Sequence, residues 1–275
     1  MLSVIILTHN EEKHIRDCLA SVRDFADELL VLDSNSTDRT VEIAREAGAR
    51  IESRPFDNYP AQRNYAIDLA RGDWIFFIDA DERATPTLGK EILGVISGQP
   101  SAVSRQPNDR RPTTADRVLS LVGFWVPRRN IIFGKEIHYT GWSPDYQPRV
   151  LKKGSARFDP AREVHELILW DGEVGYLREP LIHYNYETLA QFRAKQIKYA
   201  RYEAQIWFAE GKRAHWRGAI GQPLREFFRR YISLQGWRDG GHGLLLSSLM
   251  AYYAFVRWRM LREMQIRSLG GKIET

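Results

Sequence analysis

The chain of 275 residues and 31.9 kDa is long enough for one large domain or for a domain with an appendage. Hydrophobic residues make up 43% of it and charged residues 27%, proportions that are typical of globular proteins and exclude a wholly disordered chain. The net charge is +5, and the single cysteine, Cys18, excludes an intrachain disulfide, fits a reducing compartment and is expected to be a small buried residue.

The first hundred residues alternate strand-like and helix-like segments with short connections. The predicted strands are residues 3–7, 28–32, 50–52 and 73–78, and the predicted helices are 11–25, 39–47 and 59–70. The strands are short apolar runs, as expected where both faces of a sheet are covered. This alternation predicts an α/β fold with a parallel sheet and helices on both faces.

The rest of the chain has a different pattern. Residues 99–117 are polar and contain three prolines, which predicts a mobile loop, and residues 118–149 are aromatic-rich and read as irregular. Residues 181–186 are predicted to form a late strand, 188–211 a helix, and the segment after Gly211 two further basic, aromatic helices. We therefore predict a folded body over residues 1–188 and a helical region over 189–275.

Polar clusters follow three of the predicted strands, at residues 8–11, 33–36 and 79–81. Ligands of such sheets bind beyond the carboxyl ends of the strands, so these clusters are expected to share one site. Asp79 and Asp81 are two residues apart, so on an extended chain both carboxylates point to one side and can converge on a hard cation such as Mg²⁺. A solvated turn with capping aspartates is the alternative.

The cluster residues suit a nucleotide pocket. Asp33 can accept a hydrogen bond from a base imide or a ribose hydroxyl, or it can form an Asx turn or an N-cap. Thr8, Asn10 and Glu11 can line the same pocket or cap the first predicted helix.

Two further candidates, Arg63 and Asn64, lie on the third predicted helix and can meet a phosphate or ribose, or face solvent. Other nucleotide-binding and hydrolase motifs are absent from the sequence. There is no Gly-x-Gly-x-x-Gly after the first strand, no Gly-x-x-x-x-Gly-Lys-Ser/Thr and no Gly-x-Ser-x-Gly. These absences argue against a dinucleotide-binding fold, a P-loop NTPase and an α/β-hydrolase.

Seven segments together resemble the family 2 glycosyltransferases of GT-A fold. They are residues 2–12 (LSVIILTHNEE), 31–40 (VLDSNSTDRT), 62–64 (QRN), 74–82 (WIFFIDADE), 141–149 (GWSPDYQPR), 162–166 (REVHE) and 183–188 (HYNYET). The last three look like the bacterial branch that contains lipopolysaccharide core β-glucosyltransferases. The resemblance implies a GT-A catalytic domain over residues 1–188, Rossmann-like with a mostly parallel sheet, followed by a basic, aromatic helical appendage.

The resemblance also implies an inverting sugar transfer from a nucleotide donor, assisted by a divalent metal, Mg²⁺ or Mn²⁺. Asp33 would bind the base, usually uracil, and Asp79 would face the ribose or phosphate. Asp81 and His183 would hold the metal. Arg149 would contact the diphosphate or form a structural salt bridge.

Inversion by a single displacement needs one general base near the acceptor hydroxyl. Asp145 occupies the place where many relatives carry a Glu-Asp pair before a downstream arginine, although Pro144 precedes it here. Glu166, directly after His165, is the second candidate. We favour Asp145 and keep Glu166 open.

The tail differs from the body in charge. Residues 190–275 contain 16 Lys and Arg against 6 Asp and Glu, whereas residues 1–189 contain 24 against 29. Arginines interleaved with aromatic residues suit helices that lie on an anionic membrane surface; the alternative is aromatics packed on the body with solvated arginines. The longest candidate membrane segment, residues 244–256, is shorter than the about 20 residues of a spanning helix.

We therefore predict a cytoplasmic glycosyltransferase that associates peripherally with the cytoplasmic face of the membrane and, lacking a secretory signal, is not exported. The donor is expected to be UDP-glucose, and the acceptor a lipid-linked glycan or a lipopolysaccharide-type molecule. A polyprenyl-phosphate-type sugar transferase and a non-catalytic nucleotide-binding or nucleic-acid-binding protein are the alternatives. Nucleic acid is not an expected partner, because no reading helix or RNA-stacking motif is recognisable.

Overall fold

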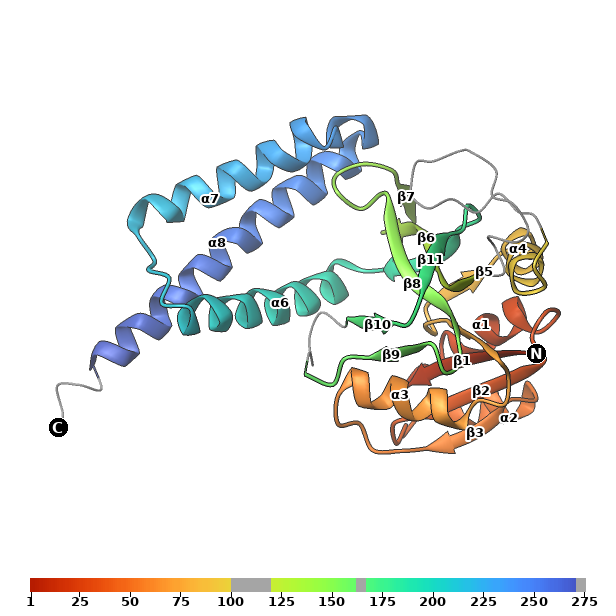
Figure 1. The fold of residues 1–275 in the computed structure, drawn as a ribbon. Helices are drawn as coiled ribbons and strands as arrows, with labels where there is room; N and C mark the ends of the chain where they lie inside the picture. The colour runs from red at the N-terminus through yellow and green to blue at the C-terminus, as the bar shows by residue number, and fades with distance from the viewer. Residues whose placement is uncertain (100–119, 162–166, 271–275) are drawn as a thin grey trace. The chain divides into compact units, whose positions relative to one another are not determined.

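The computed structural model describes residues 1–99, 120–161 and 167–270 (Figure 1). The predicted loop over 99–117, apart from Gln99, and the candidate base Glu166 lie outside the described residues. The chain divides into two compact units. The first comprises Met1–Arg129 and Asp145–His183, and the second comprises Asn130–Pro144 and Tyr184–Thr275.

A mixed sheet forms the centre of the first unit. Its strand order is β3-β2-β1-β4-β8-β6-β12-β5. Four parallel neighbours come first: β1 (Leu2–Thr8), β2 (Glu28–Asp33), β3 (Arg50–Ser53) and β4 (Trp74–Phe77). The next strands in the order are β8 (Asp145–Lys152), β6 (Leu121–Ile132), β12 (Leu181–Tyr186) and β5 (Glu82–Ala84). Strand β8 is antiparallel to its neighbour β4. The short strand β11 (Glu173–Tyr176) pairs with β6 in parallel. All four early strands and the late strand are confirmed.

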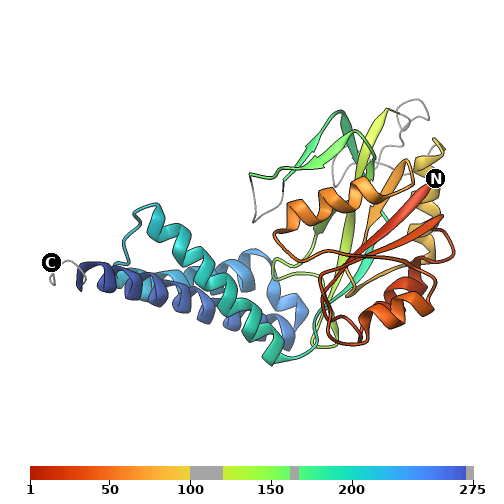
Figure 2. The ribbon, with the colours of Figure 1, turned by 90° about the horizontal axis from the view of Figure 1, so that it is seen from below.

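Helices cover both faces of this sheet, as predicted (Figure 2). On one face lie α1 (Ile15–Val22), α2 (Thr40–Glu46) and α4 (Pro86–Ile96); on the other lie α3 (Tyr59–Leu69) and the strand pair β9 (Ala156–Phe158) and β10 (Ile168–Trp170). Along β1, Val4 and Ile6 pack in one core cluster and Ile5 in the other, because successive side chains of a strand point to opposite faces. Cys18 is fully buried, as expected.

Local chemistry fixes where several helices begin and end. Asn58 caps α3 by accepting a hydrogen bond from the Ala61 amide, and Thr85 caps α4 in the same way. Gly48, with a φ of +84°, follows α2 in the left-handed conformation that glycine adopts without strain. The first helix is shorter than predicted, because Asn10 is left-handed and a turn precedes Ile15.

The expectation of irregular structure over residues 118–149 was wrong for its described part. Strands β6, β7 (Lys135–Ile137) and β8 occupy most of it. Strand β6 carries a polar run, Arg128 to Asn130, between its apolar residues. This run breaks the apolar alternation by which a strand is recognised.

Three long helices form most of the second unit: α6 (Leu189–Ala209), α7 (Trp216–Phe228) and α8 (Gly241–Gly270). A π-helical turn, η1 (Arg229–Ser233), and a 3-10 turn, η2 (Gly236–Asp239), connect the last two. Thr188 and Gln191 form a capping box that starts α6 where the sequence predicted it. The apolar core of this unit includes Tyr186, Phe192, Ala200, Leu246, Tyr253 and Val256.

A buried carboxylate ties η2 to the segment that precedes Pro144. Asp239 accepts hydrogen bonds from the backbone amides of His138 and Tyr139, at 3.2 and 3.0 Å, and from the Thr140 hydroxyl at 2.9 Å. Within the part of the chain that the structure describes, no helix is sufficiently long and apolar to cross a membrane.

Candidate active site

The predicted site residues gather at the carboxyl ends of β1, β2 and β4 in the first unit. The register of β1 on β2 places Thr8 beside Asp33. The Asp79–Asp81 segment follows β4 directly and leads into β5. Strand β8 brings Arg149 to Asp79, and β12 brings His183 to Asp81. Strand β6 brings Arg128 to Glu82, the residue after Asp81.

Asp81 and His183, predicted as metal ligands, lie together. The Asp81 Oδ2 and His183 Nε2 atoms are 3.5 Å apart, and the histidine side chain is 8% exposed. The antiparallel pairing of β12 with β5 sets His183 opposite Glu82, next to Asp81. The structure thus unites a carboxylate and an imidazole that are far apart in sequence.

This pair fits a divalent metal that shares its coordination with a substrate. Over residues 1–99, 120–161 and 167–270, no three His, Cys, Asp or Glu side chains form a group that could hold a metal alone. Mg²⁺ is usually held by one or two carboxylates while substrate phosphates and water complete its shell, and imidazole suits Mn²⁺ as well. Asp81 and His183 therefore supply a suitable protein share of such a site.

Asp79 is held by arginines. Its carboxylate forms an ion pair with Arg149 through both oxygens, and its Oδ1 lies 3.7 Å from Nη2 of Arg63. Burial raises the pKa of Asp79, but the positive charges of Arg149 and Arg63 outweigh burial and hold that pKa well below its usual range. The arginines therefore stabilise the ionised form of Asp79.

Glu82, to which the sequence reasoning gave no role, lies at the centre of these contacts. Its side chain is 0% exposed and accepts hydrogen bonds from the Asp79 amide (2.9 Å), from Arg149 Nη2 (2.6 Å) and from Arg128 Nη1 (3.3 Å). Burial lowers the pKa of Arg149, but the carboxylates of Asp79 and Glu82 raise it above its usual range. Glu82 thus positions the backbone of the Asp79–Asp81 segment. Its place directly after Asp-Ala-Asp was the available signal.

The candidate base Asp145 stands at the start of β8, opposite Arg128 of β6. Its Oδ2 accepts from Arg128 Nε at 2.9 Å and Nη2 at 2.7 Å, and its Oδ1 accepts from Gln147 Nε2 at 2.8 Å. Both carboxylate oxygens therefore have partners. Arg128 bridges Asp145 to Glu82, which connects the candidate base to the Asp79–Asp81 segment.

The candidate base-binding residue Asp33 is 2% exposed. Its Oδ1 accepts from the Thr8 hydroxyl at 2.9 Å and from the Ser36 hydroxyl at 2.5 Å, and its Oδ2 accepts from the Ser36 amide at 2.8 Å. The bond from the Ser36 amide, three residues on, is a local capping contact of the kind that was the alternative for this residue, and it is not an Asx turn, whose donor would be two residues on. Since a carboxylate oxygen can accept two hydrogen bonds, Oδ2 retains capacity for an imide donor.

Asn10 and Glu11 join the loop after β1 to the loop after β2. Asn10 Oδ1 accepts from the Thr37 amide at 2.8 Å, and the Glu11 amide donates to the Thr40 hydroxyl at 2.7 Å. The two loops are thereby fixed to each other at the edge where a nucleotide is expected.

Arg63 and Asn64, adjacent on α3, have different surroundings. The guanidinium of Arg63 lies over the rings of Phe77 and Phe158 and reaches Asp79. The amide of Asn64 instead donates to the Phe158 carbonyl at 2.8 Å and accepts from the Phe158 amide at 2.9 Å, so it fastens β9 to α3. Of the two, the structure brings Arg63 to the carboxylate cluster.

Comparisons with known proteins bear on the family of the chain. The model of glycosyl transferase family 2 matches residues 3–153, which include Asp33, Asp79, Asp81 and Asp145. The lipopolysaccharide core biosynthesis glycosyltransferase LpsC of Rhizobium meliloti is 28% identical over 261 residues, which are 93% of this chain and 89% of LpsC. An uncharacterised glycosyltransferase of Rickettsia bellii is 27% identical over 274 residues, 97% of this chain and 87% of the relative.

Among solved structures, the glucosyl-3-phosphoglycerate synthase of Mycobacterium tuberculosis, in complex with Mn²⁺, UDP and glucosyl-3-phosphoglycerate, matches with a TM-score of 0.37 and 23% identity. The match covers 47% of this chain and 44% of the synthase, a similarity too low to transfer a role to any residue. The family match, by contrast, covers more than half of the chain. Together with the mostly parallel sheet that has helices on both faces, it confirms the predicted GT-A class. The chain belongs to glycosyl transferase family 2.

Proposed function

We propose that the chain is an inverting, metal-assisted glycosyltransferase that moves glucose from UDP-glucose to a lipid-linked glycan or a lipopolysaccharide-type acceptor. The observation that carries this proposal is the approach of His183 to Asp81 within 3.5 Å, beside an Asp79 fixed by arginines. A carboxylate and an imidazole that are distant in sequence, brought together near the carboxyl ends of the parallel strands, suit a metal that is shared with a diphosphate.

The acceptor class follows from the relatives. LpsC, which this chain resembles over most of both lengths, acts in lipopolysaccharide core biosynthesis. Such acceptors are lipid-anchored, so we propose that the enzyme transfers sugar at the cytoplasmic face of the membrane. A polyprenyl-phosphate acceptor has the same lipid character and is distinguished by an acceptor panel.

Each residue then has a part. A bound divalent metal would neutralise charge on the diphosphate and so improve it as a leaving group. Asp81 and His183 would hold that metal, while Glu82 and Arg149 hold Asp79 toward the ribose or phosphate. Asp33 would accept the base imide.

The remaining step is removal of the acceptor proton. In a single displacement, the acceptor hydroxyl oxygen attacks the anomeric carbon from the face opposite the diphosphate, and its proton passes to one carboxylate. Asp145, or Glu166 as the second candidate, would accept this proton. Asp145 would have to use an oxygen that now accepts from Gln147 or Arg128.

The test is a calorimetric titration of the full chain with UDP, GDP, ADP and dTDP, each with and without Mn²⁺. We expect UDP to bind, and to bind more tightly with Mn²⁺. The Asp81→Asn variant should lose the Mn²⁺ effect, whereas Asp73→Asn, which changes an aspartate with an exposed side chain, should keep it. Failure of all four nucleotides to bind, or an undiminished Mn²⁺ effect in Asp81→Asn, would refute the proposal.

A further inference from the structure

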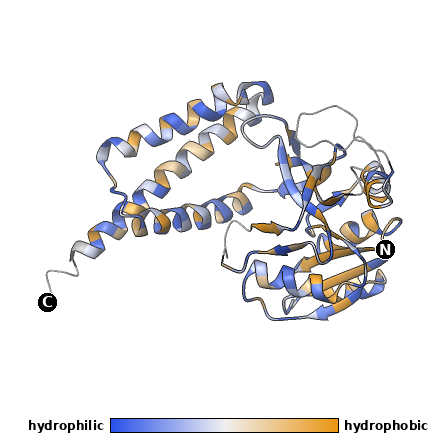
Figure 3. Cartoon of the chain, in the orientation of Figure 1, coloured by the Kyte–Doolittle hydropathy of each residue, from blue (hydrophilic) through white to orange (hydrophobic). Residues whose placement is uncertain are grey.

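Helix α7 and the turn η1 contain no buried residue. Their apolar side chains lie mostly on one exposed face, at every fourth position. This stripe consists of Trp216 (72% exposed), Ile220 (61%), Leu224 (52%), Phe228 (56%) and Ile232 (54%). Residues four apart share a helix face, so the stripe runs along α7 for about 18 Å at 1.5 Å per residue, from Trp216 to Phe228, and continues to Ile232 in η1. Figure 3 shows hydrophobic patches along α7 among its hydrophilic ones.

The less exposed side of α7 and η1 carries polar residues at three positions with the same spacing, Gln222, Glu226 and Arg230, beside the half-buried Ala219, Pro223 and Phe227. Glu226 accepts from Arg230 Nε at 2.6 Å, and Arg230 Nη1 donates to the Thr140 carbonyl at 2.7 Å. A helix at a water-exposed surface normally turns its apolar stripe inward and its polar residues outward. In α7 the apolar stripe faces outward, so burying the stripe against an apolar partner would be more favourable than leaving it in water.

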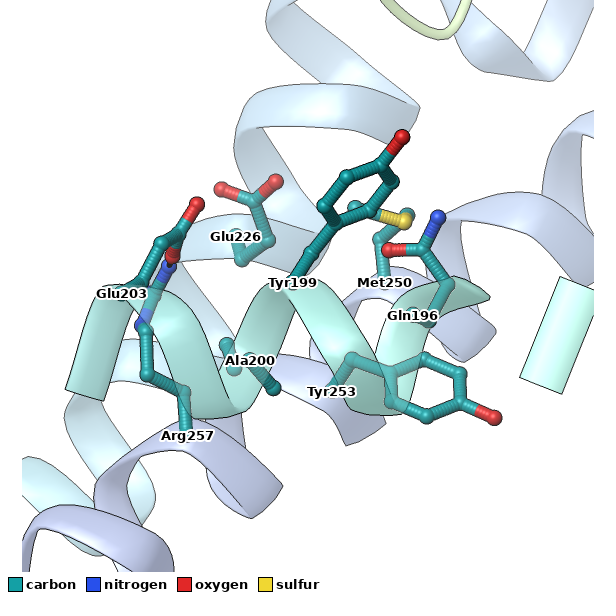
Figure 4. Close-up of a pocket in the computed structure, with 9 residues that line it drawn as sticks. Gln196, Tyr199, Ala200, Glu203, Glu226, Met250, Tyr253 and Arg257 are labelled. Atoms are coloured by element: carbon teal, nitrogen blue, oxygen red, sulfur yellow. Dashed lines mark hydrogen bonds and ion pairs between the residues drawn. The ribbon is translucent and has the colours of Figure 1, made fainter. Parts of the chain in front are cut away.

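The space behind α7 gives no other explanation of this arrangement. A cavity of about 50 Å³ lies among α6, α7 and α8, lined by Tyr199, Glu203, Glu226 and Arg257, among others (Figure 4). That volume is well below the roughly 300–1,000 Å³ of typical small-molecule sites. Glu203 forms an ion pair with Arg257 there. The cavity therefore belongs to the packing of the three helices.

The arginines of the helical unit fall into two groups. Arg230 and Arg257 are largely buried and are used inside it, by Glu226 and Glu203. Arg217, Arg225 and Arg229 each follow a stripe residue by one position and form an exposed row along the stripe. Of these three, Arg229 also forms an ion pair with Glu226. Glu226 is the single acidic residue of the sequence 216–233, and it is already paired with arginines. The outward face is therefore apolar and cationic.

We propose that this face of α7, the stripe with its arginine row, lies in the plane of an anionic lipid bilayer. The stripe would enter the boundary between head groups and acyl chains, and Arg217, Arg225 and Arg229 would meet the lipid phosphates. Trp216 at one end suits the interface, where tryptophan is enriched. A second copy of the chain is a poorer occupant, because it would bring two arginine rows together. The inference rests on the proposed function in one respect: an acceptor that is anchored in the membrane gives the enzyme a reason to bind there.

The experiment is co-sedimentation of the full chain with vesicles of phosphatidylcholine alone, or mixed with an equal amount of phosphatidylglycerol. We expect binding to the anionic vesicles that weakens with salt. The Ile220→Ser/Leu224→Ser variant should bind at least roughly tenfold more weakly, since each buried methylene group contributes about 0.8 kcal/mol. The control, Leu93→Ser/Leu169→Ser, removes two exposed leucines of the first unit and should bind as the wild type does.

A second variant tests the arginine row independently of the apolar stripe. Arg217→Gln/Arg225→Gln should reduce binding to anionic vesicles roughly tenfold or more and remove most of the salt dependence, at about 1 kcal/mol per charge. Arg259→Gln/Arg262→Gln on α8 is its matched control. If both α7 variants bind vesicles as the wild type does, the inference is wrong. It is also wrong if the wild type binds no vesicle, or forms a dimer that Ile220→Ser/Leu224→Ser dissolves.

Sugar transfer is not measured in this assay, so the two proposals can fail separately. Asp81→Asn should bind vesicles normally. Ile220→Ser/Leu224→Ser should retain Mn²⁺-dependent UDP binding, which also shows that it is folded.

Discussion

Replacing Glu82 by Gln is the sharpest test of how the site is held. Glu82 is fully buried, and its carboxylate accepts hydrogen bonds from the backbone amide of Asp79 and from the guanidinium groups of Arg149 and Arg128. The substitution keeps the size and shape of the side chain. It removes one negative charge and turns one acceptor atom into an NH₂ donor, which would face an amide or guanidinium that is also a donor.

The expected cost is large because the partners are also buried. Arg149 is 4% exposed, and among the residues that the structure describes it would retain Asp79 as its counter-charge, while Arg128 would retain Asp145. Removing one partner of a buried ion pair typically costs about 3–5 kcal/mol, because the other charge is left uncompensated. Since folded proteins are stable by about 5–15 kcal/mol, Glu82→Gln should lower the free energy of unfolding by a large fraction.

Urea unfolding, followed by fluorescence and circular dichroism, measures this change. The control is Glu42→Gln. Glu42 also accepts two hydrogen bonds from one arginine, Arg39, at 3.0 and 2.9 Å, but on an exposed helix surface. We expect Glu42→Gln to unfold at the same urea concentration as the wild type. If Glu82→Gln also unfolds at the urea concentration at which the wild type unfolds, the buried network does not stabilise the site and the role assigned to Glu82 is wrong.

Two further predictions concern carboxylates of the candidate site. Asp145→Asn should abolish sugar transfer and leave UDP binding intact; normal transfer by Asp145→Asn together with loss in Glu166→Gln would assign the base to Glu166 instead. The second prediction concerns stability in acid. The positive charges of Arg149 and Arg63 outweigh burial and lower the pKa of Asp79 below its ordinary value of 3.8. The ionised Asp79 carboxylate therefore stabilises the fold at pH values above 3.8. That contribution is lost as the pH falls through the folded pKa, so Asp79→Asn should show a shallower fall of unfolding free energy in acid than the wild type, and equal slopes would contradict the assignment.

The sequence alone identified the elements whose pattern is local. Strand β1 is a continuous apolar run because both of its faces are buried, and α6 begins at a capping box that can be read directly. Asp79 and Asp81 were found in the same way, since their spacing and their place after a strand are properties of a short segment. The resemblance to a family added His183, which no local pattern marks as a partner of Asp81.

The tertiary structure decided which distant residues meet. Arg149 reaches Asp79 and Glu82 because β8 pairs antiparallel with β4, and Asn64 is bonded to Phe158 because β9 packs on α3. Strand β6 escaped recognition because its polar run includes Arg128, which holds Glu82 and Asp145. Periodicity in a sequence records which side of a segment is buried, whereas the partner of a charged side chain depends on strand register. Register is set by the whole sheet, so no single segment contains it.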